Sequence, residues 1–505
     1  MRARPAIAAV LAVVLLGACA QEDTRVLPTT TTTTTTVPDP GTTTPGGTTP
    51  EAEGPPPFVP APIEWRDCGR RTQCATVTVP LDHDDPGGPT FDLDVARDPA
   101  DDGGRRIGAL FVNPGGPGAS ATDLVPTVAA VLPDSITDRF DVVGVDPRGV
   151  GASERLDCGL PNAELYGVDA TIDSAADEVA LLDVSRRYVA DCQQRAGDLL
   201  AHLGTRDVAR DMDAVRAAMG DEQLNYLGFS YGTAIGQVYA DLFPDRVRAM
   251  VLDGVLELGP TGLELADEQA RGFTTALDRF VAWCDSSSRC AAGPRSRALL
   301  DEVLAAAERP GGIPAPGANR DAGPGEVSLG LTYPMYSQLL WTALGDALVE
   351  AAEGDGSRMV DLADGYLGMG GFSVYFAVNC LDFAWPDDPA AVLAAAKDTG
   401  TRSPVVGEAL VNDYVRCALW PVEPEPLPAT SAPGTPPILV VSTTGDPATP
   451  YEAGVAVAER LESGVLVTHE GDGHTVVLDG NGCITDLVVD YLVDLVAPPD
   501  GTTCD

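Results

Sequence analysis

The feature that most restricts the fold is a series of short apolar runs separated by helical segments. Most of these runs are apolar throughout instead of alternating, which is typical of parallel strands covered on both faces. Two alternating runs come first, and the apolar runs follow: 75–79, 91–95, 107–112, 140–145, 223–227, 250–252, 438–441 and 465–468. Between two of them, residues 205–219 carry apolar side chains at helical spacing and end next to Gly220. This alternation of strand and helix predicts a doubly wound α/β sheet.

One long interval interrupts the alternation. Residues 256–432 contain mainly helical stretches, loops rich in glycine and proline, and many aromatic residues. A proline-rich segment at 421–437 then leads back to the next apolar run. We therefore expect a helical cap inserted at 256–432, which divides the α/β core into residues 58–255 and 433–505. The hydrophobic content of 44% is ample for such a core.

The N-terminal part has the features of a targeting segment. Two arginines precede an apolar stretch at 6–18, which is too short to span a bilayer. The stretch ends in Leu-Gly-Ala-Cys, which is similar to a bacterial lipobox. Residues 1–19 are therefore predicted to be a lipoprotein-type signal peptide, with Cys19 as the lipidated residue. The alternative is an ordinary signal peptide in which Cys19 is incidental. Residues 20–57, rich in threonine and proline, are predicted to form a disordered stalk.

The remaining cysteines and the charge balance bear on location and partners. No later apolar run is long enough to cross a membrane, so we expect attachment only through Cys19, on the extracellular face of a bacterial cell membrane, or a secreted protein. The other ten cysteines form an even set, which predicts disulfides, most simply between sequential pairs. With four histidines and no CxxC motif, zinc is disfavoured, and we expect neither metal nor cofactor.

The net charge argues against one class of partner. The chain has 32 basic and 75 acidic residues, a formal charge of −43. Such a chain has no electrostatic attraction for phosphate backbones, so nucleic acid is excluded as a partner. The sequence does not fix the oligomeric state.

The central motif is Gly-Phe-Ser-Tyr-Gly at residues 228–232. It follows the run at 223–227 and precedes a helix expected at about 233–242. In this context the motif is a nucleophile elbow, in which glycines permit a tight strand-to-helix turn that exposes the serine hydroxyl. Ser230 is thus the predicted nucleophile. The alternative is a serine in an ordinary turn.

A nucleophilic serine needs a base, and the chain contains only four histidines. His83 and His202 precede the elbow, whereas His469 and His474 follow the last apolar run. Hydrolases built this way keep the order serine, acid, histidine, with the histidine after the final strand. His474, in a Gly-rich loop, is the predicted base. His469, closer to the strand end, is expected to be a structural neighbour.

The acid should follow the penultimate strand. Asp446 comes directly after the run at 438–441, and its carboxylate would orient the imidazole and stabilise its protonated form. Thr449 and Glu452 have the spacing of a capping box, with Pro450 as the first helical residue. The rival acid is Asp253, at the end of the run at 250–252, whose other role would be to bond backbone at a turn.

Two further loops follow strands at the same edge. Residues 113–118 read Asn-Pro-Gly-Gly-Pro-Gly, and these glycines let backbone N–H groups approach a developing oxyanion, with the amide of Tyr231 as second donor. The alternative is an ordinary Gly/Pro turn. In the loop at 146–153, Arg148 is expected to hold neighbouring loops together.

Five motifs occur in order along the chain: G-G-P-G, D-x-R-G-x-G-x-S, G-x-S-Y-G-T, G-D-P-x-T-P and G-x-G-H-T. As a set they resemble the proline iminopeptidase and tripeptidyl aminopeptidase family of α/β-hydrolase serine peptidases, and the secreted tripeptidyl aminopeptidase branch is the closer match. The resemblance covers roughly residues 58–505 and implies an α/β-hydrolase core with a helical cap. It assigns the triad and the oxyanion-hole amides to Ser230, Asp446, His474, Gly116 and Tyr231.

The resemblance also implies an activity. This would be an exported serine aminopeptidase that releases short peptides, in this branch tripeptides, from free N termini through an acyl-enzyme. Its partners would be peptide substrates with free N termini. Pro114 stands where the iminopeptidases carry a histidine, which weakens any expectation of strict N-terminal proline specificity.

Acidic cap residues of this family bind the substrate ammonium group, and Asp382 is the candidate here. The alternative for Asp382 is a solvated surface carboxylate. Two other functions stay open. One is an exported carboxylesterase or lipase with the same triad, and the other is a non-catalytic, lipid-anchored binding protein on a hydrolase scaffold.

Overall fold

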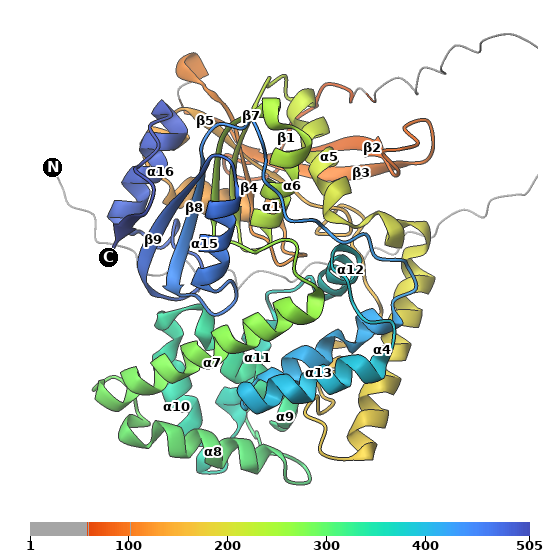
Figure 1. Cartoon of the computed structure of the whole chain (residues 1–505), viewed down its shortest axis with the longest axis vertical. Coiled ribbons are helices and arrows are strands. Elements are labelled where there is room, and N and C mark those ends of the chain that lie inside the picture. The colour runs from red at the N-terminus through yellow and green to blue at the C-terminus, as the bar shows by residue number, and fades with distance from the viewer. Residues whose placement is uncertain (1–57, 59, 102) are drawn as a thin grey trace, which may run out of the picture. The chain divides into compact units, whose positions relative to one another are not determined.

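The computed structural model describes residues 58, 60–101 and 103–505 (Figure 1). The predicted signal peptide, the lipidation site Cys19 and the predicted stalk lie outside these described residues. Among the described residues, no helix has the length and apolar character needed to cross a membrane.

A mixed sheet forms the centre of the described part. Its spatial order is β1-β2-β3-β5-β4-β6-β7-β8-β9-β10. Strands β1, β2, β3 and β5 pair antiparallel in succession, and all other neighbours are parallel. The bounds are Arg66–Asp67 (β1), Gln73–Pro80 (β2), Thr90–Asp98 (β3), Gly108–Asn113 (β4), Phe140–Val145 (β5), Leu224–Phe229 (β6), Val247–Asp253 (β7), Ile438–Gly445 (β8), Gly464–Asp472 (β9) and Thr502–Cys504 (β10). The doubly wound α/β sheet predicted from the apolar runs is confirmed.

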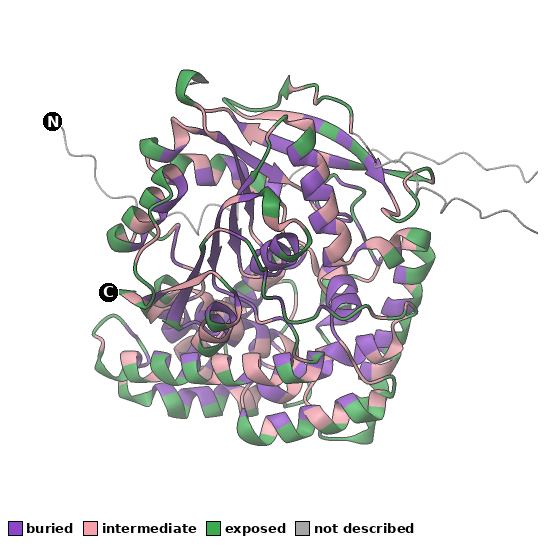
Figure 2. Cartoon of the chain, turned by 45° about the horizontal axis from the view of Figure 1, so that its top comes forward, coloured by how far each residue is buried: buried purple, intermediate pink, exposed green. Residues whose placement is uncertain are grey.

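Helices cover both faces of the parallel part, which explains why its strands are apolar throughout. On one face, Tyr226, Leu252 and Val440 join a core with α5 (Thr205–Ala218), α6 (Gly232–Leu242) and α15 (Tyr451–Arg460). On the other face, Leu227, Val251 and Val441 join a core with α1 (Ala121–Val131), α2 (Asp134–Thr137) and α16 (Gly482–Asp494). Figure 2 shows the central strands as a buried layer. Polar residues would be costly in such strands.

The chain between β7 and β8 is helical, and Figure 1 shows its helices beside the carboxyl ends of the strands. Several of these helices enclose a second apolar core around Phe280, Trp341 and Leu348. Helix α4 (Ala175–Ala196), which precedes β6, also contacts this layer through η7 (Asp413–Leu419). The other elements between β7 and β8 are α7 (Gly262–Ser286), η4 (Gly293–Arg295), α8 (Ser296–Ala307), α9 (Pro324–Thr332), η5 (Tyr333–Tyr336), η6 (Gln338–Leu340), α10 (Trp341–Ala352), α11 (Ser357–Leu367), α12 (Phe372–Asp382), α13 (Pro389–Arg402) and α14 (Gly407–Asn412).

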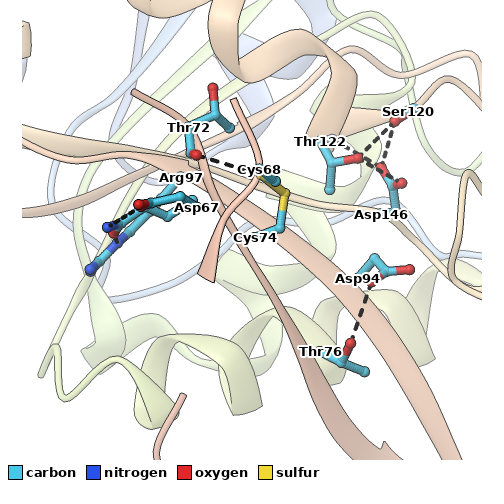
Figure 3. The surroundings of a disulfide bond; sticks show 11 residues. Asp67, Cys68, Thr72, Cys74, Thr76, Asp94, Arg97, Ser120, Thr122 and Asp146 are labelled. Carbon is cyan, nitrogen blue, oxygen red and sulfur yellow. Dashed lines mark hydrogen bonds between the residues drawn. A yellow bond between two sulfur atoms is a disulfide. The ribbon is translucent and has the colours of Figure 1, made fainter. Parts of the chain in front are cut away.

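Five disulfides link the ten described cysteines in sequential pairs, as the even set predicts. They join Cys68–Cys74, Cys158–Cys192, Cys284–Cys290, Cys380–Cys417 and Cys483–Cys504. The first joins Cys68, which directly follows β1, to Cys74 in β2 (Figure 3). The last ties β10 to α16, and β10, only three residues long, carries no pattern that sequence analysis could detect.

Candidate active site

The candidate site lies where the strand order reverses. Strand β4 is flanked by β5 on one side and β6 on the other, so the connections leaving β4 and β6 diverge at their carboxyl ends. Open α/β sheets bind their ligands in the crevice formed at such a point. The loop at residues 113–118 follows β4, and Ser230 follows β6.

Ser230 occupies a strained turn between β6 and α6. Its φ is +54°, in the left-handed region that residues other than glycine rarely adopt. Its N–H donates to the carbonyl of Asp253 at 2.9 Å. A Cβ at Gly232 would lie 2.7 Å from the carbonyl oxygen of Asn113, so only glycine allows the turn to approach the β4 loop this closely. The sequence motif therefore folds as the predicted elbow.

His474 and Asp446 lie in direct contact. Nδ1 of His474 is 2.8 Å from Oδ2 and 2.9 Å from Oδ1 of Asp446. The carboxylate is buried, and its Oδ1 also accepts the N–H groups of Ala448 and Thr449, both at 2.9 Å. Burial alone would lower the pKa of His474, but the charge and hydrogen bond of Asp446 outweigh it and raise that pKa above its ordinary value. The arrangement is suited to a general base that becomes protonated during the reaction.

The other imidazole nitrogen, Nε2, is buried and has no hydrogen-bond partner among the described residues. The ring lies against the end of β7, because a Cβ at Gly254 would come within 3.1 Å of Cε1 of His474. Ser230 donates its N–H to Asp253, the neighbour of Gly254. The candidate base and the candidate nucleophile therefore each contact the end of β7, at the neighbouring residues Gly254 and Asp253. Hydrogen bonds between such groups are often long before substrate binds.

Thr449 differs from its sequence prediction. Helix α15 begins at Tyr451 with Pro450 as its N-cap residue, and no side chain caps it, so the predicted capping box is wrong. The Thr449 hydroxyl instead donates to Oδ2 of Asp446 at 3.0 Å and lies 3.3 Å from Nδ1 of His474. A hydroxyl can satisfy either the helix or the buried carboxylate, and here it bonds the carboxylate. The local spacing could not reveal this role, because His474 is distant in sequence.

The loop after β4 lies against the elbow. Gly115 has a φ of +85°, and a Cβ there would come within 2.6 Å of the Tyr231 nitrogen. The Gly115 N–H is held by Oδ1 of Asn113 at 2.9 Å. Tyr231 directly precedes α6, where backbone N–H groups lack intrahelical partners and the helix dipole is positive. The structure therefore brings the loop of Gly116 next to the amide of Tyr231, as an oxyanion hole requires.

The other histidines lie apart from this pair. Nε2 of His83 is 2.7 Å from Asp211, and Nδ1 of His202 is 3.5 Å from Asp207. His469 lies 3.3 Å from the hydroxyl of Thr443 through Nδ1, and burial lowers its pKa. None of these three contacts Asp446 in the described structure.

Arg148 holds loops together, as expected. It is fully buried, and its guanidinium forms two hydrogen bonds with Asp211, at 2.6 and 2.8 Å, and one with the carbonyl of Pro80, at 2.8 Å. The sequence pattern around residues 146–153 therefore marks a structural loop beside the site.

Asp382 is buried, with 2% of its surface exposed. Its Oδ2 accepts the Tyr231 hydroxyl at 2.7 Å and the Thr205 N–H at 3.0 Å. Burial raises the pKa of Asp382 to about 6, although these donors oppose the rise. The contacts join α12, α5 and the elbow. These contacts indicate that Asp382 holds Tyr231 and the start of α5 in place. The binding of a substrate ammonium by Asp382 stays a prediction.

An elbow serine, a histidine bonded to a buried aspartate and a glycine loop at the topological switch point define a serine hydrolase of the α/β-hydrolase fold. Residues 403–504 match the family described as TAP-like protein. Over 89% of its length the chain is 35% identical to serine protease Hip1 of Mycobacterium tuberculosis, covering 92% of that relative. It is 39% identical to carboxylesterase B of the same organism, over 89% of this chain and 91% of the relative. It is 33% identical to a tripeptidyl aminopeptidase of Streptomyces coelicolor, over 88% and 86%. The chain belongs to the tripeptidyl aminopeptidase and proline iminopeptidase family of serine hydrolases.

Proposed function

We propose that the protein is an exported aminopeptidase that releases tripeptides from free N termini through an acyl-enzyme on Ser230. The observation that carries the proposal is the hydrogen bond between His474 and Asp446, because His474 packs on Gly254 while Ser230 donates its N–H to the adjacent Asp253. Family membership supports peptide hydrolysis, since relatives carry the names serine protease and tripeptidyl aminopeptidase.

The proposed reaction uses these groups in sequence. Nε2 of His474 takes the hydroxyl proton as Oγ of Ser230 attacks the peptide carbonyl carbon, and Asp446 stabilises the imidazolium. The amides of Gly116 and Tyr231 bind the oxyanion. His474 then protonates the leaving amine, and the C–N bond breaks. A water molecule, deprotonated by His474, hydrolyses the ester and restores Ser230.

Specificity for an N terminus requires a carboxylate at a fixed distance from Ser230, and Asp413 is the carboxylate we propose. Its side chain is partly buried, with 29% exposed, and burial raises its pKa. Burial is the main cause that raises the pKa values of Tyr366, Tyr375 and Tyr414, and the charge of Asp413 adds to each rise, so Asp413 lies near these aromatic hydroxyls. A substrate ammonium desolvated there needs such a partner. Arg416 donates to Asp413 at 3.2 Å and holds the carboxylate in place.

Aromatic side chains of the cap lie close to the candidate base. The ring of Tyr336 lies 5.5 Å from the imidazole of His474 and 6.3 Å from the ring of Tyr366. Such rings can line the site that receives the substrate. The proposed product length of three residues rests on the similarity to the tripeptidyl aminopeptidase.

Export is supported by the five disulfides, since such bonds persist in oxidising compartments. Lipid attachment at Cys19 is part of the proposal and concerns residues outside the described structure. Labelling with a radioactive lipid precursor, compared between the wild type and Cys19→Ala, tests it.

Mass spectrometry of products tests the peptidase proposal. A free-amine peptide should yield its first three residues, and the N-acetylated peptide of the same sequence should remain intact. Ser230→Ala should abolish cleavage. Ser185→Ala should not, because it removes a buried hydroxyl that has no hydrogen-bond partner among the described residues. Asp413→Asn should raise KM for the free-amine peptide at least tenfold. Asp398→Asn, which removes an exposed cap carboxylate, is its control.

A second candidate is a carboxylesterase, favoured by the 39% identity to carboxylesterase B. It becomes the better assignment if short-chain nitrophenyl esters are hydrolysed while free and acetylated peptides are both left intact.

A further inference from the structure

One residue at the end of β7 is bonded to both halves of the catalytic centre. The carbonyl oxygen of Asp253 accepts the N–H of Ser230 at 2.9 Å. Its carboxylate oxygen Oδ2 accepts the N–H groups of Val476 at 2.9 Å and Val477 at 2.8 Å. The main chain of Asp253 therefore holds the nucleophile, and its side chain holds the segment that directly follows His474.

The segment after His474 needs such a hold. Thr475 has a φ of +65°, a left-handed conformation that a β-branched residue strongly disfavours. Strained residues of this kind persist only where their surroundings fix them. A Cβ at Gly254 would come within 2.9 Å of Cγ2 of Thr475, so the loop lies directly on the strand end. The two hydrogen bonds to Asp253 thus set where the imidazole stands relative to Ser230.

The charge of Asp253 also reaches the imidazole. Asp253 is fully buried, and burial raises its pKa to about 7 against the opposing effect of the Val477 and Val476 amides. Its second oxygen, Oδ1, has no hydrogen-bond partner among the described residues. Besides the hydroxyl of Thr449, the titratable groups of the described residues that face His474 are Asp446 from the loop after β8, Asp253 from β7 and Tyr336 from the cap. When ionised, Asp253 adds to the effect of Asp446 and raises the pKa of His474.

We propose that Asp253 is a positioning residue of the catalytic centre, which fixes the His474 loop against the Ser230 turn and, when ionised, stabilises the imidazolium formed during acylation. A buried carboxylate with an unpaired oxygen is costly to keep in a folded protein. An apolar side chain would avoid this cost but would leave the amides of Val476 and Val477 without their acceptor. The retained carboxylate is therefore better explained by its two loop contacts and its charge than by packing.

Two substitutions separate the holding role from the charge. Asp253→Asn keeps an oxygen that accepts the two amides but carries no charge, whereas Asp253→Ala removes both. The assays are hydrolysis of a small nitrophenyl ester and the rate of labelling by a fluorophosphonate, neither of which depends on peptide recognition. Asp253→Ala should lower kcat about 100-fold with KM nearly unchanged, the size of effect expected when a catalytic group is displaced by about 1 Å.

Asp253→Asn should retain more activity and change its pH dependence. Only neutral His474 acts as a base, and the variant lacks the charge that raises the His474 pKa. The acidic limb of kcat/KM should therefore move to lower pH. Asp141→Asn is the control, because Asp141 is also buried and accepts the Ala100 N–H at 2.9 Å, but it lies at the amino end of β5, whereas the catalytic groups follow the carboxyl ends of the strands. It should leave the acidic limb in place.

Wild-type labelling and ester hydrolysis by Asp253→Ala would overturn the holding role, and an unshifted acidic limb in Asp253→Asn would overturn the role of the charge. If the alanine variant does not fold, the asparagine variant still decides through its pH profile. If the peptidase proposal fails, the result is different: the wild-type protein hydrolyses the ester but leaves peptides intact.

Discussion

Asp446 shows how much one side chain can contribute when its partners are fixed. It contacts His474 and Thr449 from a buried position, and both of its oxygens accept hydrogen bonds. A carboxylate held in this way keeps the imidazole in one tautomer and one orientation. The rate of the reaction therefore depends on its charge as well as its shape.

Asp446→Asn should lower kcat by about 10⁴-fold, the effect seen when the acid of a triad loses its charge. Asp446 raises the pKa of His474, and activity needs the neutral imidazole, so the remaining activity should have its acidic limb at lower pH. The pH dependence of ester hydrolysis measures both effects. Residual activity at wild-type level would show that another residue orients His474.

Asp382→Asn distinguishes two roles for the buried cap carboxylate. If Asp382 holds Tyr231 and the start of α5, the variant should lose activity equally on a small ester and on a free-amine peptide, about tenfold or more through a misplaced oxyanion donor. If it binds the substrate ammonium, KM should rise for the peptide alone. Steady-state kinetics on both substrates decide between these results.

The free energy of unfolding should also depend on Asp382, through its protonation. The pKa of Asp382 is about 6 in the folded protein, above its ordinary value near 3.9. The folded state therefore binds the proton more tightly than the unfolded state, and this stabilisation is lost as the pH rises from about 4 to about 6. Asp382→Asn should flatten the decline of the midpoint of thermal unfolding over this window.

At the scale of elements, the cap is joined to each catalytic loop. The backbone carbonyl of Tyr336 accepts the backbone N–H of His474 at 2.9 Å, and Ser337 forms an antiparallel bridge with Gly473. The start of α12 meets the loop after β4, where the backbone of Gly371 lies against that of Gly118. Because these contacts surround the site, the cap supports the catalytic loops in addition to covering them.

A pair of adjacent glycines tests this support. Gly370 and Gly371 have φ values of +73° and +74°, so alanine is similarly strained at both, by about 1 kcal/mol. A Cβ at Gly371 would lie 2.3 Å from the Gly118 carbonyl oxygen, whereas a Cβ at Gly370 meets nothing within 4 Å. Gly371→Ala should lower kcat for ester hydrolysis at least tenfold more than Gly370→Ala does. The thermal midpoints of the two variants should be similar. Equal losses would contradict the support role.

Sequence analysis was most successful where the information is local. A few neighbouring residues encode each uniformly apolar strand and the elbow turn at Ser230. The predicted acid and base after β8 and β9 are also recognised from local motifs, and their catalytic roles stay predictions. The hydroxyl of Thr449, the side chain of Asp253 and the position of Asp413 depend on contacts between distant segments. The spacing of Thr449 and Glu452 also suggested a capping box, because spacing alone does not show that the Thr449 hydroxyl bonds Asp446, three residues earlier, instead of the helix.

For the whole molecule, disulfides should stabilise most where they close long loops. Cys380–Cys417 spans 37 residues, and Cys68–Cys74 spans 6. Chain entropy gives about 4 kcal/mol for the longer loop and about 2 kcal/mol for the shorter one. The double variant Cys380→Ser/Cys417→Ser should therefore lower the thermal midpoint more than Cys68→Ser/Cys74→Ser. The reverse order would show that strain or residual structure outweighs loop length.

The order of the catalytic groups along the chain has a consequence for biosynthesis. Ser230 precedes the whole helical insertion, whereas Asp446 and His474 follow it. A nascent chain emerges from the ribosome N-terminus first, so the nucleophile appears long before its acid and base. A product whose translation stops within the cap contains the serine without the histidine that activates it. With the proposed triad, hydrolytic activity therefore begins only when nearly the entire polypeptide has been made.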